Sequence, residues 1–224
     1  MDSLLKYEFD ESVDAFSTRK CSKLPYDVIL GGQVHDIKTA VITEANPDPS
    51  TLEGVDALVT NIRGVAIGIR TADCVPILLY DRINSAVAAI HSGWKGTLRR
   101  IINSALSAMS QNFGSKPENI KVQIGPCISG ISFQVGEEIP QAFKDLEFPL
   151  ERIYSWNGPK VEGNPLSGHH IDLVDTNIWL MELAGIKREN ISCSAIDTFT
   201  DNSFYSARRD GTDSGRIITA IKLI

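Results

Sequence analysis

Residues 71–96 read Thr-Ala-Asp-Cys-Val-Pro-Ile-Leu-Leu-Tyr-Asp-Arg-Ile-Asn-Ser-Ala-Val-Ala-Ala-Ile-His-Ser-Gly-Trp-Lys-Gly, and this stretch decides how the chain folds. Two apolar runs, 75–80 and 86–90, flank a polar turn at 81–85. Short apolar runs bounded by turn residues are typical of buried strands. If the two strands pair antiparallel, the start of the first lies beside the end of the second. Cys74 and His91 are then neighbours at one edge of a sheet.

A thiolate beside an imidazole indicates either a metal site or a nucleophile–base pair. His35, which follows the Gly-Gly break at 31–32, is a third candidate ligand. Three protein ligands leave a fourth position for water or substrate, as in catalytic zinc sites. Two alternatives stay open at this point. In the first, Cys74 only packs as a small buried hydrophobic residue, and the histidines have hydrogen-bond partners near the surface. In the second, His91 acts as the base for a nucleophilic Cys74 or Cys127, and no metal is bound.

Strand and helix patterns interleave around this hairpin. The longest helical pattern covers 98–113 and predicts one amphipathic helix of about four turns that ends at Gly114. Further helices are expected over 137–144 and 172–184, and 148–168 is expected to be irregular. We predict strands in these segments: one lead-in strand within 1–16, then 38–43, 56–60, 65–69, 120–124, 191–196 and 217–221. Residues 28–30 are a short apolar piece that the Gly-Gly break at 31–32 ends.

These elements predict a single α/β domain over residues 1–224, a layered α/β/α-type sandwich with mixed sheets. Several neighbouring strands are connected directly, which argues against a purely doubly wound sheet.

The composition narrows the classes of function. A formal net charge of −6 without a cluster of basic residues argues against nucleic-acid binding. No basic, apolar leader and no long apolar span is present, so we expect a cytoplasmic protein that does not enter membranes. The four cysteines form no CxxC pair, which argues against a disulfide framework or a structural zinc site. A monomer is favoured.

Polar residues near the hairpin are further candidates. Asp73 could orient a ligand imidazole, or could cap a turn. Arg208 could clamp an anion in the predicted loop 208–211, although a solvated charged loop is the commoner explanation. Lys95 begins a helix, where N–H groups attract anions. Cys127 ends a strand and either lines a pocket or packs.

The motifs together resemble one family, the laccase-domain family of multicopper polyphenol oxidase-like proteins, also described as purine nucleoside phosphorylases. The resemblance spans nearly the whole chain, and the combination of motifs is highly specific. The matching segments are Phe16-Ser-Thr-Arg19, Gln33-Val-His35, Thr71 to Asp81, His91-Ser-Gly-Trp-Lys-Gly96, Ile124-Gly-Pro-Cys-Ile128, Phe204 to Gly211 and Gly215-Arg216.

The resemblance implies one zinc ion held by His35, Cys74 and His91. It also implies phosphate-dependent cleavage of adenosine, inosine and guanosine to the free base and ribose 1-phosphate. Associated activities are methylthioadenosine cleavage and adenosine deamination. A zinc-activated water suits deamination, and an oriented phosphate suits phosphorolysis. Cys74, His91 and Asp73 are then the catalytic candidates.

The substrate contacts are assigned on the same resemblance. Arg208, Arg19 and Lys95 are candidates for binding phosphate, while Asp73, Cys127 and Gln33 are candidates for orienting the base or the ligands. The chain departs from the family pattern in two places. Asp36 stands where members usually have glycine after the Gln-Val-His motif, and the segment 20–32 is shortened.

Three alternative functions remain. The family's older name suggests a copper-dependent phenol oxidase. Blue-copper sites add a weak axial ligand, often methionine, and Met1, Met109 and Met181 are all remote from the candidate ligands in sequence. Some members are associated with editing of cell-wall peptidoglycan precursors by hydrolysis in the cytoplasm. A purely structural metal site would need a closing fourth ligand, for which Cys127 is the candidate.

Overall fold

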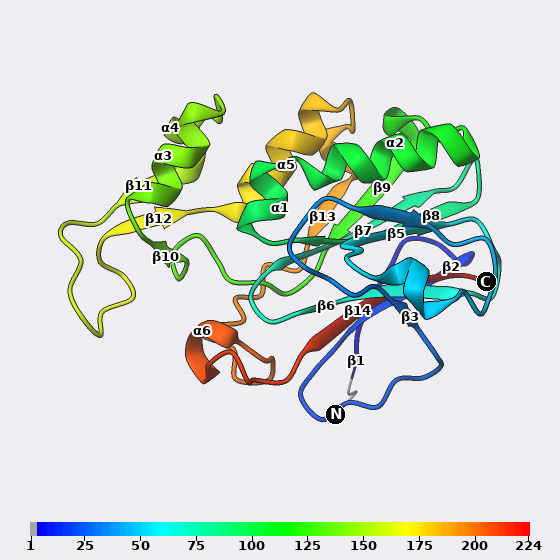
Figure 1. The fold of residues 1–224 in the computed structure, drawn as a ribbon, viewed down its shortest axis with the longest axis horizontal. Helices are drawn as coiled ribbons and strands as arrows, with labels where there is room; N and C mark the ends of the chain where they lie inside the picture. The colour runs from blue at the N-terminus through cyan, green and yellow to red at the C-terminus, as the bar shows by residue number, and fades with distance from the viewer. Residues whose placement is uncertain (1–3) are drawn as a thin grey trace.

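The structure is a computed structural model that describes residues 4–224. A six-stranded sheet with the order β13-β9-β7-β8-β5-β4 forms its centre (Figure 1). In β7 and β8, Val75 lies opposite Ser92 and Pro76 opposite His91, so the predicted antiparallel hairpin is confirmed. The strands of this sheet are β4 (Thr39–Val41), β5 (Ala57–Thr60), β7 (Val75–Asp81), β8 (Ala86–Ser92), β9 (Ile120–Ile124) and β13 (Ile191–Cys193).

Both faces of the central sheet are buried. Along β7, Val75, Ile77 and Leu79 pack against the helices, whereas Leu78 and Tyr80 pack in a second core on the opposite face. Strands that are covered on both faces need apolar residues at every position, which explains the unbroken apolar runs. The helices on the first face are α1 (Trp94–Leu98), α2 (Ile101–Phe113) and α5 (Leu173–Leu183).

A five-stranded sheet with the order β1-β2-β14-β6-β3 covers the opposite face. Its strands are β1 (Leu4–Tyr7), β2 (Val13–Thr18), β3 (Ile29–Leu30), β6 (Ala66–Thr71) and β14 (Ile217–Leu223). The single lead-in strand predicted within 1–16 is therefore wrong, and its first three residues lie outside the described part. Asp10 accepts hydrogen bonds from the N–H groups of Ser12 and Val13, which reverses the chain between β1 and β2.

The predicted layered α/β fold with mixed sheets is confirmed. The layers run from the helices through the six-stranded sheet to the five-stranded sheet (Figure 1). Among residues 4–224, no helix combines the length and the apolar character that crossing a membrane requires.

The single helix predicted over 98–113 is wrong, because Arg100 divides it. Arg100 has a φ of 61°, in the left-handed region, between α1 and α2. Its guanidinium lies over the rings of Phe148 and Trp179, and Ile101 and Ile102 immediately after it are buried in the core. The apolar spacing stays in phase across the break, so periodicity alone does not reveal it.

A smaller substructure projects to one side of the sheets (Figure 1). It contains a three-stranded sheet with the order β10-β12-β11. The elements of this substructure are β10 (Gln134–Val135), α3 (Glu138–Asp145), α4 (Leu150–Ile153), β11 (Tyr154–Trp156) and β12 (His169–Ile171). The segment 148–168, predicted to be irregular, contains α4 and β11 of this substructure, so that prediction is wrong in part. The short helix α6 (Ala207–Asp210) stands outside it, shortly before β14 (Figure 1), and the short 3-10 helices elsewhere are η1 (Pro49–Leu52), η2 (Pro117–Asn119) and η3 (Arg188–Asn190). The predicted loop 208–211 is likewise corrected, because most of it belongs to the short helix α6.

Candidate metal centre

Three side chains with metal-binding atoms meet at one end of the β7–β8 hairpin. Cys74 directly precedes β7, His91 lies near the end of β8, and His35 lies in the loop after β3. One ligand atom from each residue lies within 4.8 Å of the other two. The rings of His35 and His91 meet edge to face, with centroids 4.7 Å apart. The fold thus brings together the three residues singled out from the sequence.

Asp56, which precedes β5, links two of these residues and was not singled out from the sequence. Its Oδ1 atom accepts hydrogen bonds from the N–H of His35 (3.0 Å) and from Nδ1 of His91 (2.7 Å). Its Oδ2 atom accepts from the N–H groups of Val34 and Asp36, both at 3.0 Å. The carboxylate is fully buried, so one negative charge holds the His35 loop and the His91 ring in place.

This hydrogen bonding explains how His35 adopts a φ of 64°. A left-handed conformation is uncommon for residues other than glycine, and three successive N–H groups converging on Asp56 compensate for its cost. Asp36, where the family pattern has glycine, does not adopt a positive φ. Its own carboxylate accepts from the N–H of Ile37 and forms an ion pair with Arg99.

Mutual contacts shift the pKa values in the cluster. Burial opposes ionisation of Cys74, but hydrogen bonds with His35 and His91 outweigh it and lower the pKa of the thiol to about 6. Burial also disfavours the charged form of His91, but its bonds to Asp56 and Cys74 raise its pKa to about 9. For Asp56, burial is outweighed by the bonds from His91 and the backbone, and its pKa lies below the ordinary value.

The donor set fits zinc. Because Nδ1 of His91 faces Asp56, Nε2 remains as the ligand atom, and a carboxylate behind a ligand histidine is the usual second partner in zinc sites. The backbone also leaves room for the cluster. A Cβ atom on Gly93 would lie 3.0 Å from Sγ of Cys74 and 3.1 Å from Cδ2 of His35. His35, Cys74 and His91 would supply two imidazoles and a thiolate and leave a coordination position open.

The cluster opens into a cavity of about 460 Å³, a size suited to a small-molecule substrate. The three candidate ligands form part of its wall. The remaining lining residues are Gly32, Gln33, Arg70, Thr71, Ala72, Ala207, Thr212 and Arg216.

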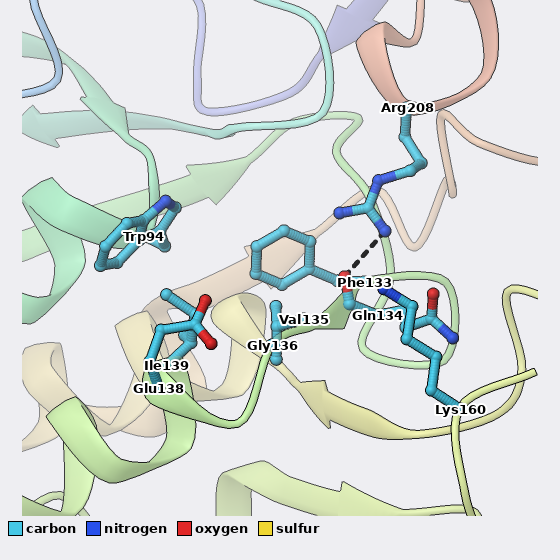
Figure 2. A pocket seen from close by; sticks show the side chains of 9 residues that line it. All are labelled: Trp94, Phe133, Gln134, Val135, Gly136, Glu138, Ile139, Lys160 and Arg208. Atoms are coloured by element: carbon cyan, nitrogen blue, oxygen red, sulfur yellow. Dashed lines mark hydrogen bonds between the residues drawn. The ribbon is translucent and has the colours of Figure 1, made fainter. Parts of the chain in front are cut away.

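A second cavity of about 520 Å³ also borders α6, since Ala207 lines the first cavity and Arg208 the second. Figure 2 shows the rings of Trp94 and Phe133 on its wall, with the Glu138 carboxylate and Arg208 around them. Arg208 donates to the carbonyl of Gln134 at 2.8 Å, and its guanidinium lies 5.5 Å from the Phe133 ring centre. The predicted anion-binding residue Arg208 therefore faces an aromatic cavity.

Asp73 does not hydrogen-bond to the ligand histidines. Its Oδ1 accepts from the Thr198 hydroxyl at 2.7 Å, and its Oδ2 accepts from the N–H of Arg208 at 2.6 Å. Asp73 thus anchors the start of α6, and Asp56 is the carboxylate that contacts His35 and His91.

The other predicted substrate-binding residues are spread over several environments. Arg19 donates to Ser203 at 2.7 Å and stacks on Phe204, and it lines neither cavity. Lys95 lies over Trp94. Cys127 is buried in the helix-side core, where burial raises its pKa, and it is not part of the three-residue cluster. Gln33 does line the metal cavity.

An open His-Cys-His cluster beside a cavity of substrate size is typical of catalytic rather than structural metal sites. The chain belongs to the multi-copper polyphenol oxidoreductase laccase family, whose profile matches residues 10–224.

Two relatives illustrate the family. The chain is 36% identical over 209 residues to a protein named purine nucleoside phosphorylase from Bacteroides thetaiotaomicron, covering 90% of this chain and 75% of the relative. It is 39% identical over 206 residues to adenosine deaminase RL5 from an unknown prokaryotic organism, covering 87% and 74%. Both relatives carry the names of enzymes that act on nucleosides.

Solved structures share the fold. Bacillus licheniformis hypothetical protein YfiH superposes with a TM-score of 0.86 at 24% identity, covering 100% of this chain and 97% of that one. YlmD from Geobacillus stearothermophilus gives 0.79 at 23% identity, covering 95% and 92%.

Proposed function

We propose that this protein is a zinc-dependent purine nucleoside phosphorylase that cleaves adenosine, inosine and guanosine with phosphate to the free base and ribose 1-phosphate. Methylthioadenosine is a further substrate of the same reaction. The observation that carries the proposal is the three-ligand cluster that opens into a cavity of substrate size. The names of the relatives supply the substrate class.

The residues of the cluster have distinct tasks in this proposal. His35, Cys74 and His91 hold the zinc ion, and Asp56 keeps the His91 proton on Nδ1 so that Nε2 stays free. Zinc, when bound, supplies Lewis-acid chemistry and a water-derived nucleophile near neutral pH. Phosphorolysis further requires that phosphate be oriented against the nucleoside and that the departing base be stabilised.

Adenosine deamination is the second reaction that we propose, and the open ligand position favours it. Water replaces the amino group at C6 of the base, giving inosine and ammonia. This reaction uses no phosphate, so the two activities depend differently on the residues that bind the anion.

A copper-dependent phenol oxidase is less consistent with the donor set. Blue-copper sites carry a weak axial ligand, often methionine, beside two histidines and a cysteine. Met109 and Met181 are buried in the helix-side core, and Met1 lies outside the described residues.

The deciding experiment combines metal analysis with product detection from inosine and phosphate. We expect one equivalent of zinc and release of hypoxanthine and ribose 1-phosphate, both lost in Cys74→Ala and His91→Ala. Hypoxanthine release that persists in both variants contradicts the proposed site. Copper content with oxygen uptake, lost on chelation, supports the phenol oxidase instead.

A further inference from the structure

Two arginines lie on the wall of the metal cavity, and neither was a candidate for binding phosphate in the sequence. Arg70 comes from β6, where it is the only exposed residue in an otherwise buried strand. Arg216 comes from the segment between α6 and β14. Residues more than a hundred positions apart thus bring two positive charges to the cavity that holds the candidate metal ligands.

The charges of these arginines are not compensated by carboxylates. Neither forms an ion pair within residues 4–224, although the protein as a whole carries a net charge of −6. Their hydrogen bonds go to uncharged groups. Arg70 donates to the carbonyl of Gly31 at 2.9 Å, and Arg216 donates to the carbonyls of Thr212 (3.0 Å), Ser214 and Gly215 (3.1 Å) and to the Ser214 hydroxyl (3.4 Å). The cavity lining contains no aspartate or glutamate. Such a wall attracts anions.

Arg70 is held rigidly beside the metal ligands. The Gln33 amide donates to the Arg70 carbonyl and accepts from the Arg70 N–H, both at 2.8 Å. Gln33 precedes His35 by two residues, so the segment that supplies a metal ligand also fixes the backbone of Arg70. A pre-positioned guanidinium loses less freedom when it binds an oxyanion.

The same wall contains a buried hydroxyl without a partner. Thr71 is 2% exposed and lines the cavity, and its Oγ1 has no hydrogen-bond partner among the described residues. Buried polar atoms are normally paired, and an unpaired one calls for an explanation such as a missing ligand. This hydroxyl points independently to a polar ligand in the cavity.

We infer that Arg70 and Arg216, with the Thr71 hydroxyl, form the site for the inorganic phosphate that serves as co-substrate. The inference rests on the proposed phosphorylase function and identifies the residues that bind its second substrate. Guanidinium groups suit phosphate oxygens because they donate paired, charge-assisted hydrogen bonds. The aromatic second cavity suits a dianion less well, because the Glu138 carboxylate offsets one of its two positive side chains, Lys160 and Arg208, whereas the metal cavity has two arginines and no carboxylate.

The test measures phosphorolysis and deamination in the same zinc-loaded protein. Arg70→Gln and Arg216→Gln are each expected to raise the KM for phosphate about 10- to 100-fold, and Thr71→Val about 2- to 10-fold. Deamination of adenosine is followed in parallel because it uses no phosphate, and its kcat/KM is expected to fall by a smaller factor than the KM for phosphate rises. Arg82→Gln is the matched control, because Arg82 is 72% exposed at the far end of the β7–β8 hairpin.

The outcomes separate this inference from the proposed function. An unchanged KM for phosphate, or a parallel loss of both reactions, overturns the assignment of the two arginines. If the variants instead raise only the KM for adenosine 5′-phosphate as a deamination substrate, the arginines bind a nucleotide ester, and the assignment to inorganic phosphate is wrong.

Calorimetric titration of the zinc-loaded protein with inorganic phosphate provides a readout independent of turnover. Phosphate binding that weakens in both arginine variants supports the site even if the wild type catalyses no phosphorolysis, in which case only the proposed function fails. Phosphorolysis by the wild type, together with unchanged phosphate binding in both variants, overturns the site alone.

Discussion

Replacing Asp56 by asparagine tests whether one buried carboxylate positions the metal ligands. Asparagine has nearly the same shape, but one carboxylate oxygen becomes an NH2 group that only donates. Each oxygen of Asp56 accepts two hydrogen bonds, Oδ1 from His35 and His91 and Oδ2 from Val34 and Asp36. Whichever way the amide turns, two donors lose their acceptor.

The magnitude follows from those two donors. An unpaired buried donor costs about 1–3 kcal/mol. The amide is expected to turn its NH2 group toward Val34 and Asp36, because Val34 is exposed and water reaches the loop. The free energy of unfolding should then fall by about 2 kcal/mol, at the lower end of the sum for two donors. The amide oxygen still accepts from Nδ1 of His91 in this orientation, but the negative charge beside the ligand is gone and the His35 loop loses two of its hydrogen bonds. Zinc binding should therefore weaken about 10-fold, at the lower end of the range for a change in such a partner.

Two measurements check this prediction. Urea unfolding in the presence of a chelator gives the stability of the metal-free protein, and competition with a chromophoric chelator gives the Kd for zinc. Asp36→Asn is the control, because the Asp36 carboxylate is 42% exposed and pairs with Arg99 at the surface. Its effect should stay within about 0.5 kcal/mol. Wild-type zinc affinity in Asp56→Asn would refute the positioning role.

Three further predictions concern the same site. In metal-free protein, the rate at which iodoacetamide alkylates Cys74 should follow the thiolate fraction, with a midpoint near the pKa of about 6 and a fall in rate below that pH. Bound zinc should protect the thiol. A midpoint near pH 9 contradicts the lowered pKa. Gly93→Ala should weaken zinc binding about 10-fold or more, since the new methyl group would press on Cys74. Gly96→Ala, whose nearest contact would be 3.4 Å, should not, and equal effects of the two substitutions would argue against steric crowding. Asp73→Ala should keep zinc but lower kcat/KM, because it frees the backbone of Arg208; loss of zinc would instead assign Asp73 to the metal.

The hairpin and its consequences were accessible from the sequence because they depend on local patterns. Apolar runs separated by a polar turn predict paired strands, and antiparallel pairing places Cys74 beside His91. The break between α1 and α2 at Arg100 could not be predicted from the sequence, since the spacing of apolar residues continues through it. The turn between β1 and β2 was missed for a different reason, because the single predicted lead-in strand includes the turn residues Asp10, Glu11 and Ser12.

The partners of the candidate ligands depend on contacts that no local pattern encodes. Asp56 is 21 residues from His35 and 35 from His91, and in the sequence it only begins a strand. Arg70 directly follows the strand predicted over 65–69, and only the structure shows that β6 continues through it to Thr71. Arg208, which the sequence favoured for phosphate, was placed by α6 against the aromatic cavity instead.

The sequence by itself determined the layered fold, the hairpin and, through its resemblance to a family, the three residues of the candidate metal centre. Only the tertiary structure decided which carboxylate supports them and which arginines share their cavity. The physical reason is that strand and helix periodicity reflects burial, which neighbouring residues specify. Hydrogen bonds to Asp56, and the presence of Arg216 in the cavity that Arg70 lines, depend instead on how separate segments are stacked.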